Sequence, residues 1–120
     1  MAVASGVLAG KCIWLTRPIG TPGQLQRRLE GLGAKVLQAP LLEIQPLGED
    51  HPSLQAGLGY IARLADYRHI IFISGNAVRH GMALIKRVWT RPPQGLDWYA
   101  IGAGTASQLG QFVADVQHPP

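Results

Sequence analysis

Three segments of the chain share one pattern: a short apolar run, a turn of small residues, and then a stretch in which apolar residues recur at helical spacing. The apolar runs cover residues 12–15, 70–73 and 98–101. Runs of this length predict buried strands, and the spacing that follows each of them is that of one helix face. The pattern therefore predicts three strand–turn–helix units.

Each predicted helix has an apolar stripe, and the first helix also has clear ends. Thr21 is its expected N-cap and Pro22 its first residue, while Gly31 and Gly33 mark its end. Each stripe predicts the face that packs against a sheet. The stripes are Leu25, Leu29 and Leu32; Val78, Met82, Ile85 and Trp89; and Ala106, Leu109 and Val113.

Further elements are predicted between the first and second units. Residues 35–39 alternate polar and apolar side chains, as a half-buried strand does. Residues 40–47 are extended and contain two prolines, which suits an edge or crossover strand. Residues 48–52 mark a boundary, and Ser53 is the expected cap of the helix that follows.

Strands that alternate with helices predict an α/β fold with a mostly parallel sheet. The continuous apolar runs predict strands that are buried on both faces. Only two strands are predicted after the boundary at 48–52, too few for a doubly wound sheet, and the chain stops soon after its last predicted helix. We therefore interpret the chain as truncated.

The composition is that of a globular domain, since 47% of the 120 residues are hydrophobic and 15% are charged. No apolar run approaches the roughly 18 residues that a membrane-spanning helix needs. No basic segment precedes the apolar N-terminus, so a signal peptide is not predicted. The single cysteine, Cys12, excludes a disulfide framework and is expected to be buried. A cytoplasmic location fits this cysteine usage best.

The net charge of +4 favours polyanionic partners. The cations are dispersed, however, with Arg27–Arg28 and Lys86–Arg87 as the only adjacent pairs, and the tryptophans do not lie among them. Solvated helix faces account for both pairs, so neither a nucleic-acid groove nor a membrane surface is predicted. A small polycarboxylate or phosphate is the expected partner.

The three strand-to-helix turns are the places where chemistry is expected. Ligands of open parallel sheets bind beyond the carboxyl ends of the strands, and helix N-termini there favour anions. Ser74, Asn76 and Thr105 add side-chain donors to these turns, and Arg17 adds a positive charge. A ligand with several carboxylates suits this set. Alternatively, the three polar residues only cap their own helices, which stabilises a helix by about 1 kcal/mol.

Other motifs are weaker. Residues 102–107 are similar to a dinucleotide-binding fingerprint, but Ser107 replaces its third glycine. The histidines and Cys12 lack the spacing of a zinc site, and no G-x-S-x-G turn is present, so neither a metal site nor a hydrolase nucleophile is predicted. Asp66 and Asp97 precede strands and are predicted to be turn residues at the opposite end of the sheet.

Three segments, taken in order, resemble the uroporphyrinogen-III synthase family. IWLTRP, followed by QLQRRLEGLGAKVLQAPLLEIQPL, is similar to the first strand, helix and crossing segment of that family. YRHIIFISGNAV and WYAIGAGTASQL are similar to two later strand–turn–helix motifs of the family. The resemblance covers residues 11–116, and members of the family are considerably longer.

The resemblance implies a bilobed architecture of flavodoxin-like, parallel-sheet lobes, in which the chain starts in one lobe, crosses to the other and later returns. Residues 1–39 would open the first lobe, residues 40–47 would form one linker strand, and residues 48–120 would form an incomplete second lobe. It also implies a monomeric family. The unfinished sheets of this chain, by contrast, predict self-association through exposed strand edges.

The resemblance further implies an enzyme of tetrapyrrole and haem biosynthesis. Its substrate, hydroxymethylbilane, bears eight carboxylates; it loses water, ring D is inverted, and the macrocycle closes without a metal or organic cofactor. Closure occurs readily without the enzyme but then lacks the inversion, so the enzyme mainly holds the substrate in one geometry. With half of the cleft missing, this chain alone is expected to be inactive.

Matching the motifs residue by residue places Ser74 and Thr105 at cleft-facing positions of the family. Ile73 stands where the family usually has threonine, which removes one donor. The catalytic acid stays unassigned, because the resemblance places the family's proposed tyrosine in the half that this chain lacks. The three tyrosines of this chain do not match its motif; these are Tyr60, Tyr67 and Tyr99. The implied substrate-binding set is Arg17, Ser74, Gly75, Asn76, Ala77, Gly102 and Thr105.

Two alternatives to this enzyme stay open. A nucleotide-binding, Rossmann-like module would need the third glycine of the fingerprint and a later acidic residue. A non-enzymatic α/β ligand-binding or receiver-like domain would want acidic residues after the first strand, where this chain has Thr16 and Arg17.

Overall fold

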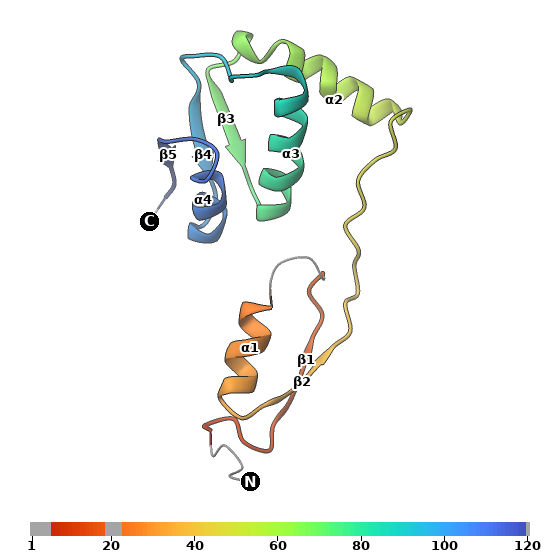
Figure 1. Cartoon of the computed structure of the whole chain (residues 1–120), viewed down its shortest axis with the longest axis vertical. Coiled ribbons are helices and arrows are strands. Elements are labelled where there is room, and N and C mark those ends of the chain that lie inside the picture. The colour runs from red at the N-terminus through yellow and green to blue at the C-terminus, as the bar shows by residue number, and fades with distance from the viewer. Residues whose placement is uncertain (1–5, 19–22, 120) are drawn as a thin grey trace. The chain divides into compact units, whose positions relative to one another are not determined.

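The computed structural model describes residues 6–18 and 23–119. The chain forms two compact units, Met1–Gln45 and Pro46–Pro120, which are treated separately below (Figure 1). Both units are of the α/β class, with small parallel sheets and helices in alternation. The fold class read from the sequence is therefore confirmed. No helix of the described residues is both long and apolar enough to cross a membrane.

The first unit is a strand–helix–strand motif. It consists of β1 (Cys12–Leu15), α1 (Gln24–Gly31) and β2 (Lys35–Gln38). The two strands pair in parallel, with Cys12 opposite Lys35 and Leu15 opposite Gln38. Gly23 precedes α1 as its N-cap and provides no side-chain cap, whereas the predicted start at Thr21 and Pro22 lies outside the described residues.

Only one face of the first sheet is covered. Ile13 and Val36 are half-buried, but their neighbours Trp14 and Leu37, which are register partners, are 57% and 56% exposed. Cys12 is also exposed, so the prediction that it is buried was wrong. The reason is that an apolar run is buried only where something covers it, and no described element covers this side of β1.

The predicted linker strand at residues 40–47 is not formed. The backbone N–H of Leu41 donates to the Thr16 carbonyl at 3.2 Å, but no strand is present in this range, and Leu41 and Leu42 are about 70% exposed. A strand needs a partner for its N–H and C=O groups, and the described residues offer none here. The two compact units divide between Gln45 and Pro46, within the predicted linker.

The second unit contains a three-stranded parallel sheet in the order β3-β4-β5. Its elements are α2 (Pro52–Ala62), a 3-10 turn (Leu64–Asp66), β3 (His69–Phe72), α3 (Gly75–Val88), β4 (Asp97–Ala100), α4 (Ala103–Leu109) and β5 (Val116–Gln117). The two predicted strand–turn–helix units are confirmed. The sequence missed β5, because a strand of two residues is too short to show a period of alternation.

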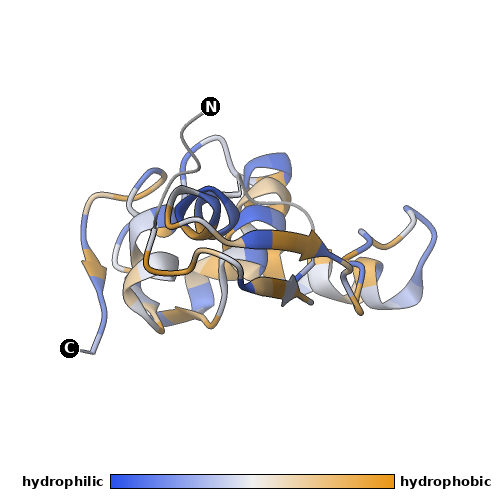
Figure 2. Cartoon of the chain, turned by 90° about the horizontal axis from the view of Figure 1, so that it is seen from below, coloured by the Kyte–Doolittle hydropathy of each residue, from blue (hydrophilic) through white to orange (hydrophobic). Residues whose placement is uncertain are grey.

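Helices α3 and α4 pack against the same face of this sheet. Phe72, Trp98 and Ala100 point from the strands into the core, and the rings of Phe72 and Trp98 stack at 6.3 Å between centroids. The predicted stripes supply the other side of the core. Figure 2 colours the ribbon by hydropathy: the strands are largely hydrophobic, and the helices carry both hydrophobic and hydrophilic residues. The buried apolar residues of these two helices are Val78, Met82, Ile85, Ala106 and Leu109.

The opposite face of the same sheet is open. Ile71 of β3 is 61% exposed, and its register partner Tyr99 is half-buried. The expectation that these strands are buried on both faces was therefore wrong for the described residues. The continuous apolar runs did identify strands of a parallel sheet, but they did not show which face is covered.

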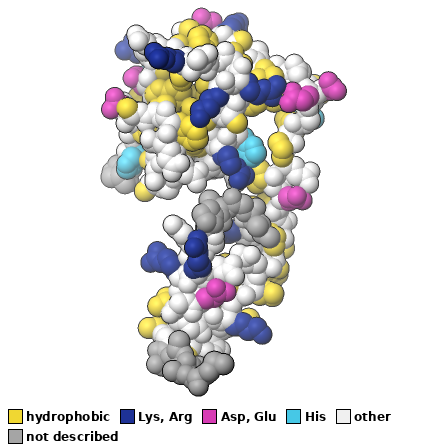
Figure 3. All heavy atoms as spheres, viewed as in Figure 1, with side chains coloured by type: hydrophobic (Ala, Val, Ile, Leu, Met, Phe, Trp, Pro, Cys, Tyr) yellow, Lys and Arg dark blue, Asp and Glu magenta, His cyan; other side chains and the backbone are white. Residues whose placement is uncertain are grey.

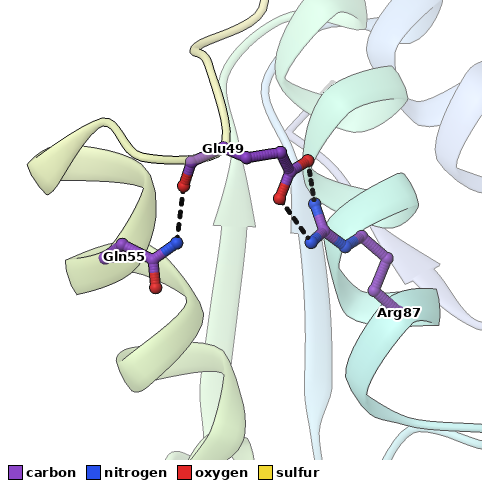
Figure 4. A network of polar contacts seen from close by, with 3 residues as sticks. All are labelled: Glu49, Gln55 and Arg87. Carbon is purple, nitrogen blue, oxygen red and sulfur yellow. Dashed lines mark hydrogen bonds and ion pairs between the residues drawn. The ribbon is translucent and has the colours of Figure 1, made fainter.

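The turn that leads into α2 is hydrogen-bonded to two helices, α2 and α3 (Figure 4). The Arg87 guanidinium, in the last turn of α3, donates to both carboxylate oxygens of Glu49 at 3.1 and 2.9 Å. The Gln55 side chain of α2 donates to the Glu49 carbonyl at 2.6 Å. These bonds fix where the chain enters the second unit.

The helix that begins after this turn has an unexpected cap. Pro52 is its first residue, so the N-cap is His51, whose Nδ1 accepts from the Ser53 N–H at 3.1 Å. The prediction that Ser53 caps this helix was wrong, because a proline at the first helical position makes the residue before it the cap.

Candidate functional site

The two strand-to-helix turns of the second unit lie next to each other. Phe72 at the end of β3 pairs with Ala100 at the end of β4, and the Ile101 N–H donates to the Phe72 carbonyl at 2.9 Å. Because β3 and β4 are parallel neighbours, the segments that follow them emerge at one edge of the sheet. The predicted residues Ser74–Ala77 and Gly102 therefore meet at this edge, which we call the carboxyl edge.

Ser74 begins α3. Its backbone is extended, with φ −159° and ψ 160°, and its Oγ accepts a hydrogen bond from the Ala77 N–H at 3.1 Å. The hydroxyl is thus engaged as the helix cap, which is the structural role considered for it above. The N–H groups of Gly75 and Asn76 have no helical acceptor, as at any helix start. They form, with Ser74, the amide-rich end of a helix of 14 residues.

Asn76 is held by a basic side chain of the same helix. Its Oδ1 accepts from Arg79 Nη2 at 3.0 Å, and the same Nη2 lies 3.5 Å from His80 Nε2. The sequence reasoning treated Asn76 as a donor and overlooked Arg79. The signal was the spacing of three residues, which brings two helical side chains to one side. Arg79 adds a positive charge to the first two turns of α3.

Gly102 and Thr105 have different positions in the second turn. Gly102 has φ +87°, a conformation that side-chain-bearing residues rarely adopt, and precedes α4 without a side-chain cap. Thr105 is only 9% exposed and lies on the side of α4 that carries Ala106 and Leu109 into the core. Thr105 therefore does not cap α4, and its side chain belongs to the core face of this helix.

Arg17 belongs to the other unit. It follows β1 by two residues and is exposed, at the carboxyl end of that strand. The structure thus places Arg17 at the kind of turn that the sequence predicted. Its grouping with the residues of the second unit stays a prediction.

The opposite end of the second sheet carries a different cluster. His69 Nδ1 lies 3.3 Å from Asp97 Oδ2, and the His69 ring meets the Tyr99 ring edge-on at 5.6 Å. Asp97 is the first residue of β4, so its predicted position away from the carboxyl edge is confirmed, although it lies in the strand and not in a turn. An open hollow lined by residues 96–98 and 113–117 lies at this end as well.

The face of the second unit seen in Figure 3 has no strong concentration of Lys and Arg side chains. In Figure 3 the Lys and Arg side chains are spread over the visible face of the second unit among neutral and apolar ones. No group of three or more His, Cys, Asp or Glu side chains within residues 6–18 and 23–119 is placed to hold a metal ion. The carboxyl edge is thus the place where backbone donors and a basic side chain come together.

Comparison with known proteins gives a consistent result. A profile of the family described as "Uroporphyrinogen-III synthase HemD" matches residues 23–120. A curated relative from Synechococcus elongatus, named uroporphyrinogen-III synthase, is 32% identical over 110 residues, which make up 89% of this chain and 39% of the relative. The chain therefore spans well under half the length of that relative.

Proposed function

The chain belongs to the uroporphyrinogen-III synthase family, and we propose that it is part of an enzyme that closes hydroxymethylbilane into a macrocycle with inversion of ring D. The observation that carries the proposal is the similarity of nearly the whole chain to a relative with this name, at 32% identity over 110 residues. The carboxyl edge of the second unit supports it, because its groups suit an anionic ligand.

The substrate of this reaction bears eight carboxylates, and the reaction removes one water molecule and joins the two ends of the chain. Closure needs no strong catalyst, but inversion needs the substrate to be held in one folded arrangement. Residues that bind carboxylates at fixed positions are therefore the main requirement of the site. Backbone N–H groups at helix starts meet this requirement, because they are rigid and carry a partial positive charge.

In the proposal the residues have distinct roles. The Gly75 and Asn76 N–H groups bind a carboxylate at the start of α3, with Ser74 fixing the turn as its cap. Ala77 supplies the N–H that Ser74 caps, and Gly102 gives the second turn its shape. Two further residues complete the set: Arg17 offers a positive charge at the carboxyl end of β1 in its own unit, and Thr105 holds α4 on the core.

The proposal leaves the catalytic acid to another part of the enzyme. The Tyr99 ring meets edge-on the ring of His69, which is the first residue of β3. Tyr60 and Tyr67 are exposed on α2 and before β3. The described chain therefore contributes binding and orientation to the proposed reaction.

Binding of uroporphyrinogen III to the purified chain tests this proposal. We expect thermal stabilisation of the chain, together with backbone amide shifts in ¹H–¹⁵N spectra that concentrate on residues 74–79 and 101–104. NAD serves as the control ligand, because residues 102–107 are similar to a dinucleotide fingerprint. Stabilisation by NAD and not by uroporphyrinogen III would overturn the proposal in favour of a nucleotide-binding module.

A further inference from the structure

Gln108 of α4 lies directly over the first residue of α3. A β-carbon built on Gly75 would be 2.6 Å from Gln108 Oε1 and 2.9 Å from its Nε2 and Cδ. Separations this short are closer than atomic contact allows. The side-chain amide of Gln108 therefore occupies the space that any other residue at position 75 would fill, and it reaches this position from the neighbouring helix.

The polar atoms of this amide have no partner within the described residues. No hydrogen bond joins Gln108 Oε1 or Nε2 to another described group. Neither atom is buried, because every buried side-chain N or O atom of the described residues has a hydrogen-bond partner. The next residue, Leu109, is fully buried and holds this part of α4 against the core. The backbone of Gln108 is thus held in place, and its side-chain amide lies at the carboxyl edge beside Gly75.

We propose that Gln108 is a specificity-determining residue of the proposed site, whose amide N–H donates to a carboxylate of the tetrapyrrole bound at the start of α3. This inference rests on the proposed function, because it is that function which supplies the carboxylate. It adds a side-chain donor to the backbone donors named above. It also assigns a reason for glycine at position 75, which is to leave room for the amide.

The geometry makes Gly75 and Gln108 a coupled pair. An alanine at position 75 displaces the Gln108 amide, at little cost in stability, because the amide is the far end of a flexible side chain. Alanine is also the better helix former at this position, the first of α3. Gly75→Ala and Gln108→Ala therefore remove the same group from the same place, by different routes.

Gln108→Glu separates binding from packing. Glutamate has the shape of glutamine, so a residue that only fills space would tolerate this change. A residue that donates to a carboxylate would not, because the new side chain is an acceptor with a negative charge. We expect the glutamate variant to bind the ligand more weakly than the alanine variant.

The experiment is a ¹H–¹⁵N titration of the purified chain with uroporphyrinogen III. We expect Gln108→Ala and Gly75→Ala each to raise the Kd about tenfold, the scale of one hydrogen bond to a charged group. The double variant should be no weaker than either single one, and thermal unfolding should stay close to that of the wild type. Gln111→Ala and Gly57→Ala serve as controls, since Gln111 is exposed and a β-carbon at Gly57 meets nothing within 4 Å.

Each outcome bears on one of the two proposals. If the wild type binds and Gln108→Ala binds equally well, the role of Gln108 is overturned while the proposed function stands. Tolerance of Gln108→Glu, or additive losses in the double variant, would overturn it in the same way. If the wild type itself does not bind, the proposed function fails and this inference with it. In the free chain, an absent nuclear Overhauser effect between the Gln108 amide protons and Gly75 Hα would contradict the placement.

Discussion

Replacing Ser74 with alanine should destabilise the second unit by removing the cap of its longest helix. Ser74 Oγ accepts the Ala77 N–H at 3.1 Å, and both residues are half-buried, so water replaces this acceptor only partly. Loss of an N-cap acceptor costs about 1 kcal/mol. For a unit of this size, that free energy corresponds to a decrease in Tm of about 4–8 °C.

Thermal unfolding of the whole chain, followed by circular dichroism, measures this decrease. Ser53→Ala is the matched control, because Ser53 contributes its backbone N–H, and not its hydroxyl, to the cap at His51. Ser74→Asp provides a second comparison. Aspartate caps a helix as well as serine does and places a negative charge at its positive end, so the Tm should equal or exceed that of the wild type.

The aspartate variant also separates stability from binding. Its carboxylate would repel the carboxylates of uroporphyrinogen III at the start of α3, so binding should weaken while the fold is maintained. Three results would contradict the reasoning: an unchanged Tm for Ser74→Ala, an equal decrease for Ser53→Ala, or undiminished ligand binding by a stable Ser74→Asp variant.

Three further substitutions test other parts of the second unit by the same unfolding measurement. Glu49→Gln breaks the bidentate pair with Arg87 and should cost less than about 1 kcal/mol, with the loss vanishing in high salt; an equal loss for Asp50→Asn would show that general charge is responsible. Gly102→Ala should cost about 1–3 kcal/mol, because φ at this turn is +87°; wild-type stability would mean that the turn can relax. Leu109→Ala should cost about 2–5 kcal/mol, since Leu109 is 0% exposed; a surface-like loss of a few tenths would contradict its place in the core.

The elements of the second unit could be predicted from the sequence because their signals are local. The stripe of Val78, Met82 and Ile85 repeats at the helical period, and all three residues are buried in α3. The apolar run before Ser74 ends one residue after β3 does, and Ser74 is a residue type that favours helix starts. Period and capping depend on near neighbours in the chain, which the sequence displays directly.

The faces and ends that depend on other elements could not be predicted in this way. Cys12 and Ile71 lie in apolar runs but are exposed, because burial requires a covering element and not only an apolar residue. His51 caps α2 through its ring, a role for which histidine carries no strong preference. β5 has two residues, and it is a strand only because it pairs with its neighbour β4.

The candidate site shows the same division between backbone and side chains. The position of the two turns follows from the order of strands and helices, so the sequence alone led to the segments around Ser74 and Gly102. Thr105 was predicted to face the ligand and lies on the core face, whereas Gln108, three residues later, reaches the carboxyl edge. In α4 the direction of each side chain depends on how the helix is rotated against the sheet, and that rotation is set by burial of Ala106 and Leu109. A site built mainly from backbone N–H groups is insensitive to such errors, because the amides of a turn stay in place whichever side chains surround them.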